Sequence, residues 1–191
     1  MQRELKILLT SSNLFLLAGG LFGPIYAVFV EQIGGDLLTA GGAYGAFSIS
    51  AGILIFFLSR WEDHVKHQEK LVIIGFLLNC MGYAGYLFIR SPIDLFIVQI
   101  MFGIGEAVNT PAFDGLYSRH LDRGKFVSEW GMWESMYRII TAAAAAVGGL
   151  LALMFGFRLL FAVMLIISVT GLLVSVLLVY PRKRKWSFIP S

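Results

Sequence analysis

Apolar runs of about 20 residues recur along the whole chain, and no other feature restricts its fold as much. A helix of about 20 apolar residues is long enough to cross the hydrocarbon core of a bilayer. Only 14% of the residues are charged, whereas a soluble domain carries about a quarter. We therefore expect an all-α membrane protein with one transmembrane domain (1–191). The sequence predicts six spans with short connections: 7–30, 40–58, 71–89, 93–116, 127–155 and 157–179.

Basic residues gather on one side of these predicted spans. Twelve of the 15 Lys and Arg residues lie in the N-terminal segment, the second and fourth connections and the tail, whereas only Arg90 and Arg158 lie on the other side. The positive-inside rule then predicts cytoplasmic N- and C-termini in a cell (plasma or inner) membrane. The basic tail (180–191) is expected to contact lipid headgroups rather than nucleic acid. Four tryptophans fall near the same side, as interfacial anchors do: Trp61, Trp130, Trp133 and Trp186.

The chain has few residues suited to enzymatic or metal chemistry. Cys80 is the single cysteine and lies inside the third predicted span, and the histidines His64, His67 and His120 all lie in connections. Ser-His and Cys-His catalysis and metal ligation therefore lack their usual residues. The sequence predicts no metal, no cofactor and no enzymatic activity.

Several short motifs occur in a known order. The second connection reads SRWEDHVKHQEK, the fourth span contains LFIVQIMFGIGEA, and the fifth contains AAAAAVGG. With Asp63, Leu95, Gly103 and Gly105 at the matching positions, the chain resembles one half of a major facilitator superfamily transporter over essentially its whole length. It departs from the family pattern where Gln99 replaces an arginine and where the fifth span lacks a Gly-Pro pair, which argues against the drug/proton antiporter branch.

The resemblance implies a half-bundle made of two inverted three-helix repeats, where family members have two six-helix halves. Spans one and four each carry glycines before an interior proline, Pro24 or Pro111. Since the cavity of this fold lies between halves, a lone half would expose polar groups to lipid. We expect a parallel C2 homodimer with one shared cavity; pairing with a different half-protein, or a fragment of a longer gene, are the alternatives. Two glycine pairs are expected to allow close helix packing: Gly19 with Gly23, and Gly41 with Gly45.

Polar residues at membrane depth form two stripes. On the fourth span they follow steps of three and four residues, and on the fifth span Glu134, Arg138 and Thr141 do the same. An ionised group in hydrocarbon is costly, so both stripes should face protein or a watery cavity. The fourth-span stripe consists of Gln99, Phe102, Glu106, Asn109 and Phe113.

Glu106 and Arg138 lie at matched depths on consecutive spans and are therefore expected to be partners. They would form either a structural ion pair or part of a solute and proton site. With Glu134 also at depth, two carboxylates face one guanidinium, and we assign the surplus acid, Glu106, to proton or substrate binding. Further polar groups that would line the cavity or make ordinary interhelical hydrogen bonds are Asn13, Tyr26, Tyr44 and Ser48.

Charged residues at the cytoplasmic ends form a second candidate site. In the family that the chain resembles, the second connection helps to latch the cytoplasmic side. The resemblance implies this role for Asp63 and Asp114, with Lys66 and Arg119 beside them; ordinary solvated loop charges are the alternative.

The most favoured function is secondary active transport of a small polar or amphipathic solute by alternating access, coupled to protons as a symporter. Two other functions remain open. One is a six-span scaffold that transports nothing, and the other is a pore along the dimer axis. The expected partners are a second copy of the chain, the solute, H+ and the lipid bilayer, with no nucleic acid.

Overall fold

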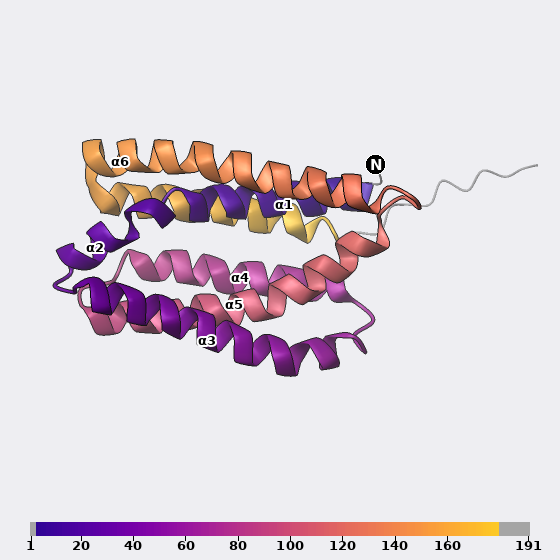
Figure 1. Ribbon diagram of the computed structural model, residues 1–191, viewed down its shortest axis with the longest axis horizontal. Helices are drawn as coiled ribbons and strands as arrows, with labels where there is room; N and C mark the ends of the chain where they lie inside the picture. Colours follow the sequence, from indigo (N-terminus) through magenta and orange to yellow (C-terminus); the bar gives the residue numbers. More distant parts are fainter. Residues whose placement is uncertain (1–2, 180–191) are drawn as a thin grey trace, which may run out of the picture.

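The computed structural model describes residues 3–179, and every regular element among them is helical (Figure 1). The predicted tail contacts (180–191) and Trp186 lie outside the described residues. The elements are α1 (Arg3–Gly20), the short 3-10 helix η1 (Gly23–Ile25), α2 (Tyr26–Gln32), α3 (Leu37–Glu62), α4 (Gln68–Tyr86), α5 (Pro92–Arg119) and α6 (Phe126–Val176).

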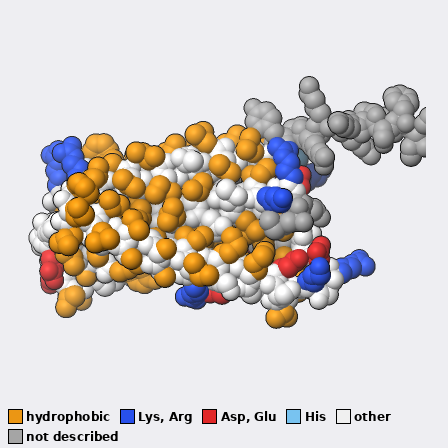
Figure 2. Space-filling view, turned by 90° about the horizontal axis from the view of Figure 1, so that it is seen from above, with side chains coloured by type: hydrophobic (Ala, Val, Ile, Leu, Met, Phe, Trp, Pro, Cys, Tyr) orange, Lys and Arg blue, Asp and Glu red, His pale blue; other side chains and the backbone are white. Residues whose placement is uncertain are grey.

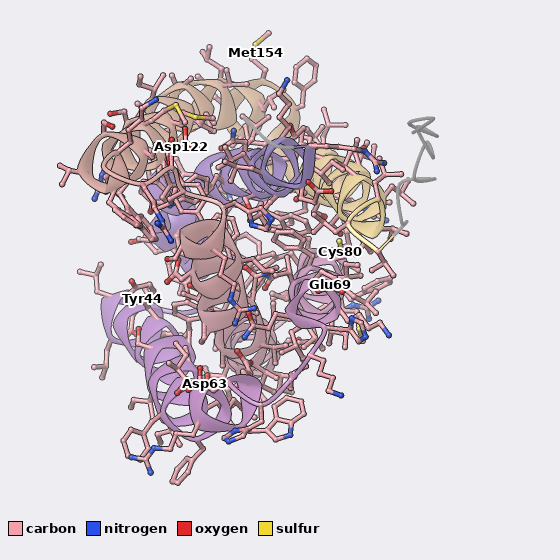
Figure 3. The ribbon with its side chains drawn as sticks, turned by 90° about the vertical axis from the view of Figure 1, so that its right-hand side faces the viewer. Tyr44, Asp63, Glu69, Cys80, Asp122 and Met154 are labelled. Carbon is pink, nitrogen blue, oxygen red and sulfur yellow. The ribbon has the colours of Figure 1, made fainter. Side chains whose placement is uncertain are left out.

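The long helix α6 turns back on itself at Gly156. This residue has φ 79° and ψ 170°, a conformation that glycine adopts without the steric penalty of a Cβ atom. The turn divides α6 into a first arm (126–155) and a second arm (157–176), and α1 packs between them (Figures 1 and 3). The predicted boundary between the fifth and sixth spans falls at this glycine.

Four helical segments are long and apolar enough to cross a membrane: Arg3–Gln32, Leu37–Glu62, Pro92–Arg119 and Phe126–Val176. The 19-residue helix α4 is outside this set, so six crossings stay a prediction. Figure 2 shows one face of the molecule, where hydrophobic side chains cover the middle and most charged side chains lie toward the two ends. This distribution is typical of a protein whose middle contacts lipid and whose ends contact water.

The helices form two groups. One contains α1 and both arms of α6, the other contains α3, α4 and α5, and contacts between α4 and α6 join them (Figure 1). Small residues permit the closest approaches: Gly148 of α6 lies against the backbone carbonyl of Leu21, and Gly20 of α1 lies against Ala144. Helices pack closely where a Cβ atom is absent.

The predicted role of the glycine pairs is wrong within one chain. A Cβ atom added at Gly23, Gly41 or Gly45 would meet nothing within 4 Å, and only Gly19 has a neighbour, the Tyr83 hydroxyl. The spacing of the pairs indicates a shared helix face, but the face of α3 that carries Gly41 and Gly45 points away from the other helices.

Local signals place the helix ends. Asp36 caps α3 by accepting a hydrogen bond from the backbone N–H of Thr39 (2.7 Å). Ser91 and Asp94 form a capping box at the start of α5, where Pro92 occupies the first turn. Pro24 lies in η1, at the break between α1 and α2, whereas α5 continues past Pro111.

Candidate functional site

A cavity of about 710 Å³ lies between the two helix groups. The helix α5 forms its back, and α3 and the first arm of α6 lie on either side, with Tyr44 of α3 at the edge (Figure 3). Tyr44 is 61% exposed, so the cavity is open on this side. The polar and charged residues of its wall are Ser12, Tyr26, Tyr44, Asn79, Tyr83, Tyr86, Gln99, Glu106, Asn109, Thr110, Asp114, Glu134, Tyr137 and Thr141.

The polar stripe of the fourth predicted span lies along this wall. Its members recur every three or four residues of α5, so they share one face of the helix. All five line the cavity: Gln99, Phe102, Glu106, Asn109 and Phe113.

Glu106 presents its carboxylate to the cavity without a cationic partner. Its Oε1 accepts a hydrogen bond from the Thr110 hydroxyl, one turn further along α5, at 2.9 Å. Among residues 3–179, no Lys, Arg or His nitrogen lies within 4.0 Å of this carboxylate. The charge of Glu106 is therefore available to a solute or a proton.

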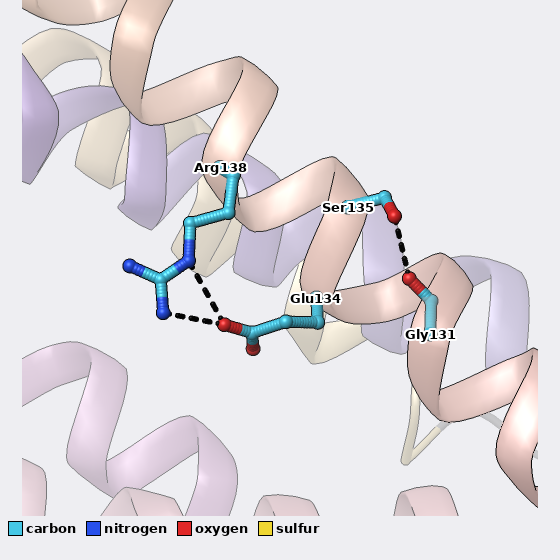
Figure 4. Close-up of polar contacts among 4 residues, drawn as sticks. All are labelled: Gly131, Glu134, Ser135 and Arg138. Carbon is cyan, nitrogen blue, oxygen red and sulfur yellow. Dashed lines mark hydrogen bonds and ion pairs between the residues drawn. The ribbon is translucent and has the colours of Figure 1, made fainter.

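Arg138 pairs with Glu134 rather than with Glu106. Its Nε and Nη2 donate to Glu134 Oε1 at 2.9 and 2.6 Å (Figure 4). Residues four apart on a helix are neighbours before any tertiary packing, and this local partner replaces the expected one on α5. The two side chains are 73% and 56% exposed. Glu134 and Thr141 line the cavity, whereas Arg138 does not.

Of the two asparagines predicted for the site, one links two helices and the other lies outside the cavity wall. The Asn109 side chain lines the cavity, but its Nδ2 donates to the backbone carbonyl of Val72 at 3.1 Å and so links α5 to α4. Asn13 is outside the cavity wall, and its Oδ1 is buried without a hydrogen-bond partner in the described chain. Ser48 also lies outside the wall, whereas Tyr26 and Tyr44 belong to it.

The structure does not assemble the expected cytoplasmic gate. Asp63, Lys66 and Arg119 are exposed, and none of them forms an ion pair within the described residues. Asp114 lies one turn deeper in α5 than Arg119 and lines the cavity instead. The charges that the motif places close in sequence therefore point into solvent, and Asp114 belongs to the same site as Glu106.

Sequence reasoning missed a buried acid next to the motif. Glu62 is 2% exposed, and neither of its carboxylate oxygens has a partner in the described chain. Its backbone carbonyl accepts a hydrogen bond from Gln68 Nε2 at 3.2 Å. The only signal was its position beside Asp63, which does not indicate which of two adjacent acids faces inward.

The sequence pattern also did not predict several aromatic residues of the cavity wall. Trp133, which was expected to anchor the chain at the membrane interface, packs on Phe113 with ring centroids 4.8 Å apart and lines the cavity. Tyr83 and Tyr86 of α4 contribute rings from the opposite group of helices. No group of three or more metal-ligating side chains occurs within the part of the chain that the structure describes.

These features define a class: a helical multi-pass membrane protein with a polar, aromatic cavity between two helix groups. The model of the Major Facilitator Superfamily matches residues 8–191. The chain belongs to this superfamily, whose members are transporters rather than enzymes.

Two relatives support this assignment. The chain is 29% identical over 151 residues to the uncharacterized MFS-type transporter YitZ of Bacillus subtilis, covering 75% of this chain and 87% of the relative. It is 21% identical over 146 residues to the uncharacterized MFS-type transporter MJ1560 of Methanocaldococcus jannaschii, covering 76% of this chain. The matched region spans only 38% of that second relative.

Proposed function

We propose that the chain is one half of a secondary active transporter, in which two copies form a parallel C2 homodimer around one shared cavity. Transport would proceed by alternating access and be coupled to protons. Membership of a transporter superfamily supports the transport function. The open side of the cavity, between α3 and the first arm of α6, is the observation that supports the dimer (Figure 3).

Lipid is a poor cover for this open side. Glu134 and Arg138 are 56% and 73% exposed there, and charged groups at the middle of a bilayer cost at least about 2.5 kcal/mol each. A second copy would enclose them in protein and in a water-filled cavity. In a closed twofold arrangement the same surface serves both copies.

The surfaces beside the opening suit helix packing. On α3, Gly41, Gly45 and Gly52 have open space around them, and on the first arm of α6, Ala142 and Ala146 are exposed. Small residues allow helices in a membrane to approach closely. We therefore place α3 of one copy against the first arm of α6 of the other.

The lengths of the relatives are consistent with this arrangement. YitZ is matched over 87% of its length and so has a size similar to the present chain, whereas MJ1560 is matched over only 38%. A superfamily fold that uses two six-helix halves would be completed here by a second copy.

The carboxylate of Glu106 is the candidate for proton coupling. It faces the cavity, and no cation of the described chain neutralises it. Ionisable residues inside a membrane commonly belong to proton or substrate pathways. Glu106 would bind a proton in one step of the cycle and release it in another.

Cysteine cross-linking tests the dimer. Cys80 is the only native cysteine, so a Cys80→Ser background permits clean pairs. Leu37, where α3 begins, and Phe155, where the first arm of α6 ends, lie at the same end of the bundle. Gly45 is eight residues from Leu37 and Ala146 is nine from Phe155, so the two lie at similar depths of about 12 and 14 Å.

Coexpressed Gly45→Cys and Ala146→Cys chains with different tags should form a mixed disulfide dimer in native membranes. Replacing Ala146→Cys by Ile166→Cys, on the second arm, should abolish it; equal cross-linking in both pairs would contradict the interface.

Proton-coupled flux tests the transport function. Proteoliposomes containing a trapped pH dye would be exposed to sugars, amino acids, organic cations and organic anions. At least one solute should drive proton movement in the wild type, and Glu106→Gln should remove it while leaving the dimer intact. Failure of every solute to drive either proton flux or isotope exchange would contradict transport.

A further inference from the structure

We propose that the solute of this cavity is an organic cation with aromatic or other apolar groups. This inference rests on the proposed transport function and names the chemical class of its solute. The charge of the cavity wall, the aromatic rings beside that charge and an unpartnered hydroxyl together carry it.

The cavity wall carries negative charge only. Its ionisable carboxylates are Glu106, Asp114 and Glu134, and no Lys, Arg or His belongs to the wall that the described residues form. Arg138 neutralises Glu134 from outside the wall. Glu106 and Asp114 have no ion-pair partner among residues 3–179.

Two uncompensated carboxylates select for positive charge. Attraction and repulsion between unit charges both grow as water is excluded, so a cation gains and an anion loses as it enters the cavity. Glu106 and Asp114 lie eight residues apart on α5, or about 12 Å along the helix. A cation bound near either acid would therefore still experience the other.

Aromatic rings stand beside these acids from several helices. Tyr26, Tyr83, Phe102 and Trp133 all belong to the wall. The Tyr137 ring belongs to it too, but it already holds the Arg138 guanidinium, 5.0 Å from its centroid. The quadrupole of an aromatic ring attracts a cation that lies over its face, and the ring also binds apolar groups. Carboxylates together with rings are suited to a charged nitrogen or phosphorus centre that carries hydrophobic substituents.

A sugar fits this wall less well. Such a solute needs many donors and acceptors at fixed positions, because each unpaired buried hydroxyl is costly. The Asn109 amide already donates to the Val72 carbonyl, and Thr110 already donates to Glu106. Aromatic rings make up much of the remaining wall, where Asn79, Gln99 and Thr141 add further polar groups.

A buried hydroxyl in the wall lacks a partner. Ser12 is 6% exposed, lines the cavity, and its Oγ has no hydrogen-bond partner within the described chain. A buried polar atom left unpaired is destabilising, so a ligand group or its bound water would stabilise this position. The volume of about 710 Å³ lies within the usual range for small-molecule sites.

Tetraphenylphosphonium and tetraphenylborate provide a direct test, because they share a shape and differ in the sign of their charge. Binding of each labelled ion to the full chain in lipid nanodiscs would be measured against empty nanodiscs, which gives the lipid partitioning. We expect saturable binding of tetraphenylphosphonium and none of tetraphenylborate. Saturable binding of the anion alone, or of neither ion, would overturn the proposal.

Variants then locate the site. Glu106→Gln and Asp114→Asn should each weaken tetraphenylphosphonium binding at least tenfold, and the matched control Glu31→Gln, at an exposed position at the end of α2, should leave it unchanged. Thermal unfolding checks that each variant folds. The comparison of tetraphenylphosphonium with tetraphenylborate uses the wild type alone and so does not depend on any variant. Equal affinity in all three variants would overturn the proposal.

The two proposals can fail separately. If a sugar or an anion drives proton flux while tetraphenylphosphonium does not bind, the chain is a transporter and the solute class is wrong. If tetraphenylphosphonium binds in a Glu106-dependent manner but no solute is moved or exchanged, the solute class holds and the transport function is wrong.

Discussion

Arg138 donates two hydrogen bonds to a single oxygen of Glu134, at 2.9 and 2.6 Å, within one turn of the first arm of α6. Among residues 3–179, the guanidinium that the sequence places at membrane depth is thus neutralised on its own helix (Figure 4). Across the cavity, Glu106 has the Thr110 hydroxyl as its polar partner. This division of charge makes one side of the cavity nearly neutral and leaves the α5 side negative.

Gly148→Ala should destabilise the fold. Gly148 lies against the backbone carbonyl of Leu21, so an added methyl group would force α6 away from α1. Overpacking of this kind costs about 1 to 3 kcal/mol, and each kcal/mol lowers Tm by about 2 to 4 °C in a chain of this length. Thermal unfolding in detergent would measure it.

Gly149→Ala is the matched control, since it is adjacent on the same helix and a Cβ atom there would meet nothing within 4 Å. Its Tm should equal or slightly exceed that of the wild type, because alanine is the better helix former. Equal destabilisation by both substitutions would contradict the close α1–α6 contact.

Asn109→Ala should loosen the contact between α4 and α5. The variant loses the hydrogen bond from Asn109 Nδ2 to the Val72 carbonyl (3.1 Å), and such interhelical bonds in membranes contribute about 0.6 kcal/mol on average. We expect a Tm lower by about 1 to 2 °C, with Ser48→Ala on the exposed face of α3 as the control. An unchanged Tm would show that water replaces the bond without cost.

Asp36 should make the capping of α3 dependent on pH. Hydrogen bonds from the Thr39 side chain and backbone lower the pKa of Asp36 below its usual 3.8. Because the folded pKa is depressed, the stabilisation is complete above the unfolded pKa of 3.8 and is lost as pH falls through the lower folded pKa. Asp36→Ala should therefore lower Tm near neutral pH and have little effect once the wild-type carboxyl is protonated.

Asp36→Asn separates capping from general acid sensitivity, because its amide oxygen still caps and does not titrate. The Tm difference between Asp36→Asn and Asp36→Ala should persist at low pH. If wild type and Asp36→Ala keep a constant Tm difference across the whole pH range, the ionised cap contributes nothing.

Periodic features were predictable from the sequence because they depend on one helix at a time. The stripe from Gln99 to Phe113 follows helical spacing, and its five members share the cavity wall. Contacts between different helices were not predictable in this way. Whether Arg138 contacts Glu106 or Glu134 depends on interhelical distance, and the partner on the same helix was the one selected.

The same reason explains the errors at α3 and its connection. Spacing places Gly41 and Gly45 on one face, but only the packed bundle determines that this face is free of neighbours. Likewise the acidic pair Glu62 and Asp63 has one buried and one exposed member. The rotation of α3 about its own axis decides both which glycines are exposed and which acid is buried. The sequence pattern does not define this rotation where apolar residues surround the whole helix.

Charge removal at the α6 pair should weaken the proposed dimer. If the pair is enclosed between two copies, Arg138→Gln leaves the Glu134 carboxylate unpaired, and removing one partner of an enclosed pair is far more costly than replacing both. We expect at least a tenfold weaker dimer, or about 1.4 kcal/mol, for Arg138→Gln or Glu134→Gln alone. Single-molecule photobleaching in lipid vesicles of varied protein density measures this equilibrium.

The double variant Glu134→Gln/Arg138→Gln provides the decisive comparison, because it removes both charges and leaves neither carboxylate nor guanidinium without a partner. Its dimer should be within about threefold of the wild type, which amounts to about 0.7 kcal/mol. An ion pair exposed to water contributes only about 0 to 1 kcal/mol to stability. If each single variant weakens the dimer by less than threefold, water rather than a second copy surrounds Glu134 and Arg138. Glu31→Gln, at the exposed end of α2, should leave the equilibrium unchanged in either case.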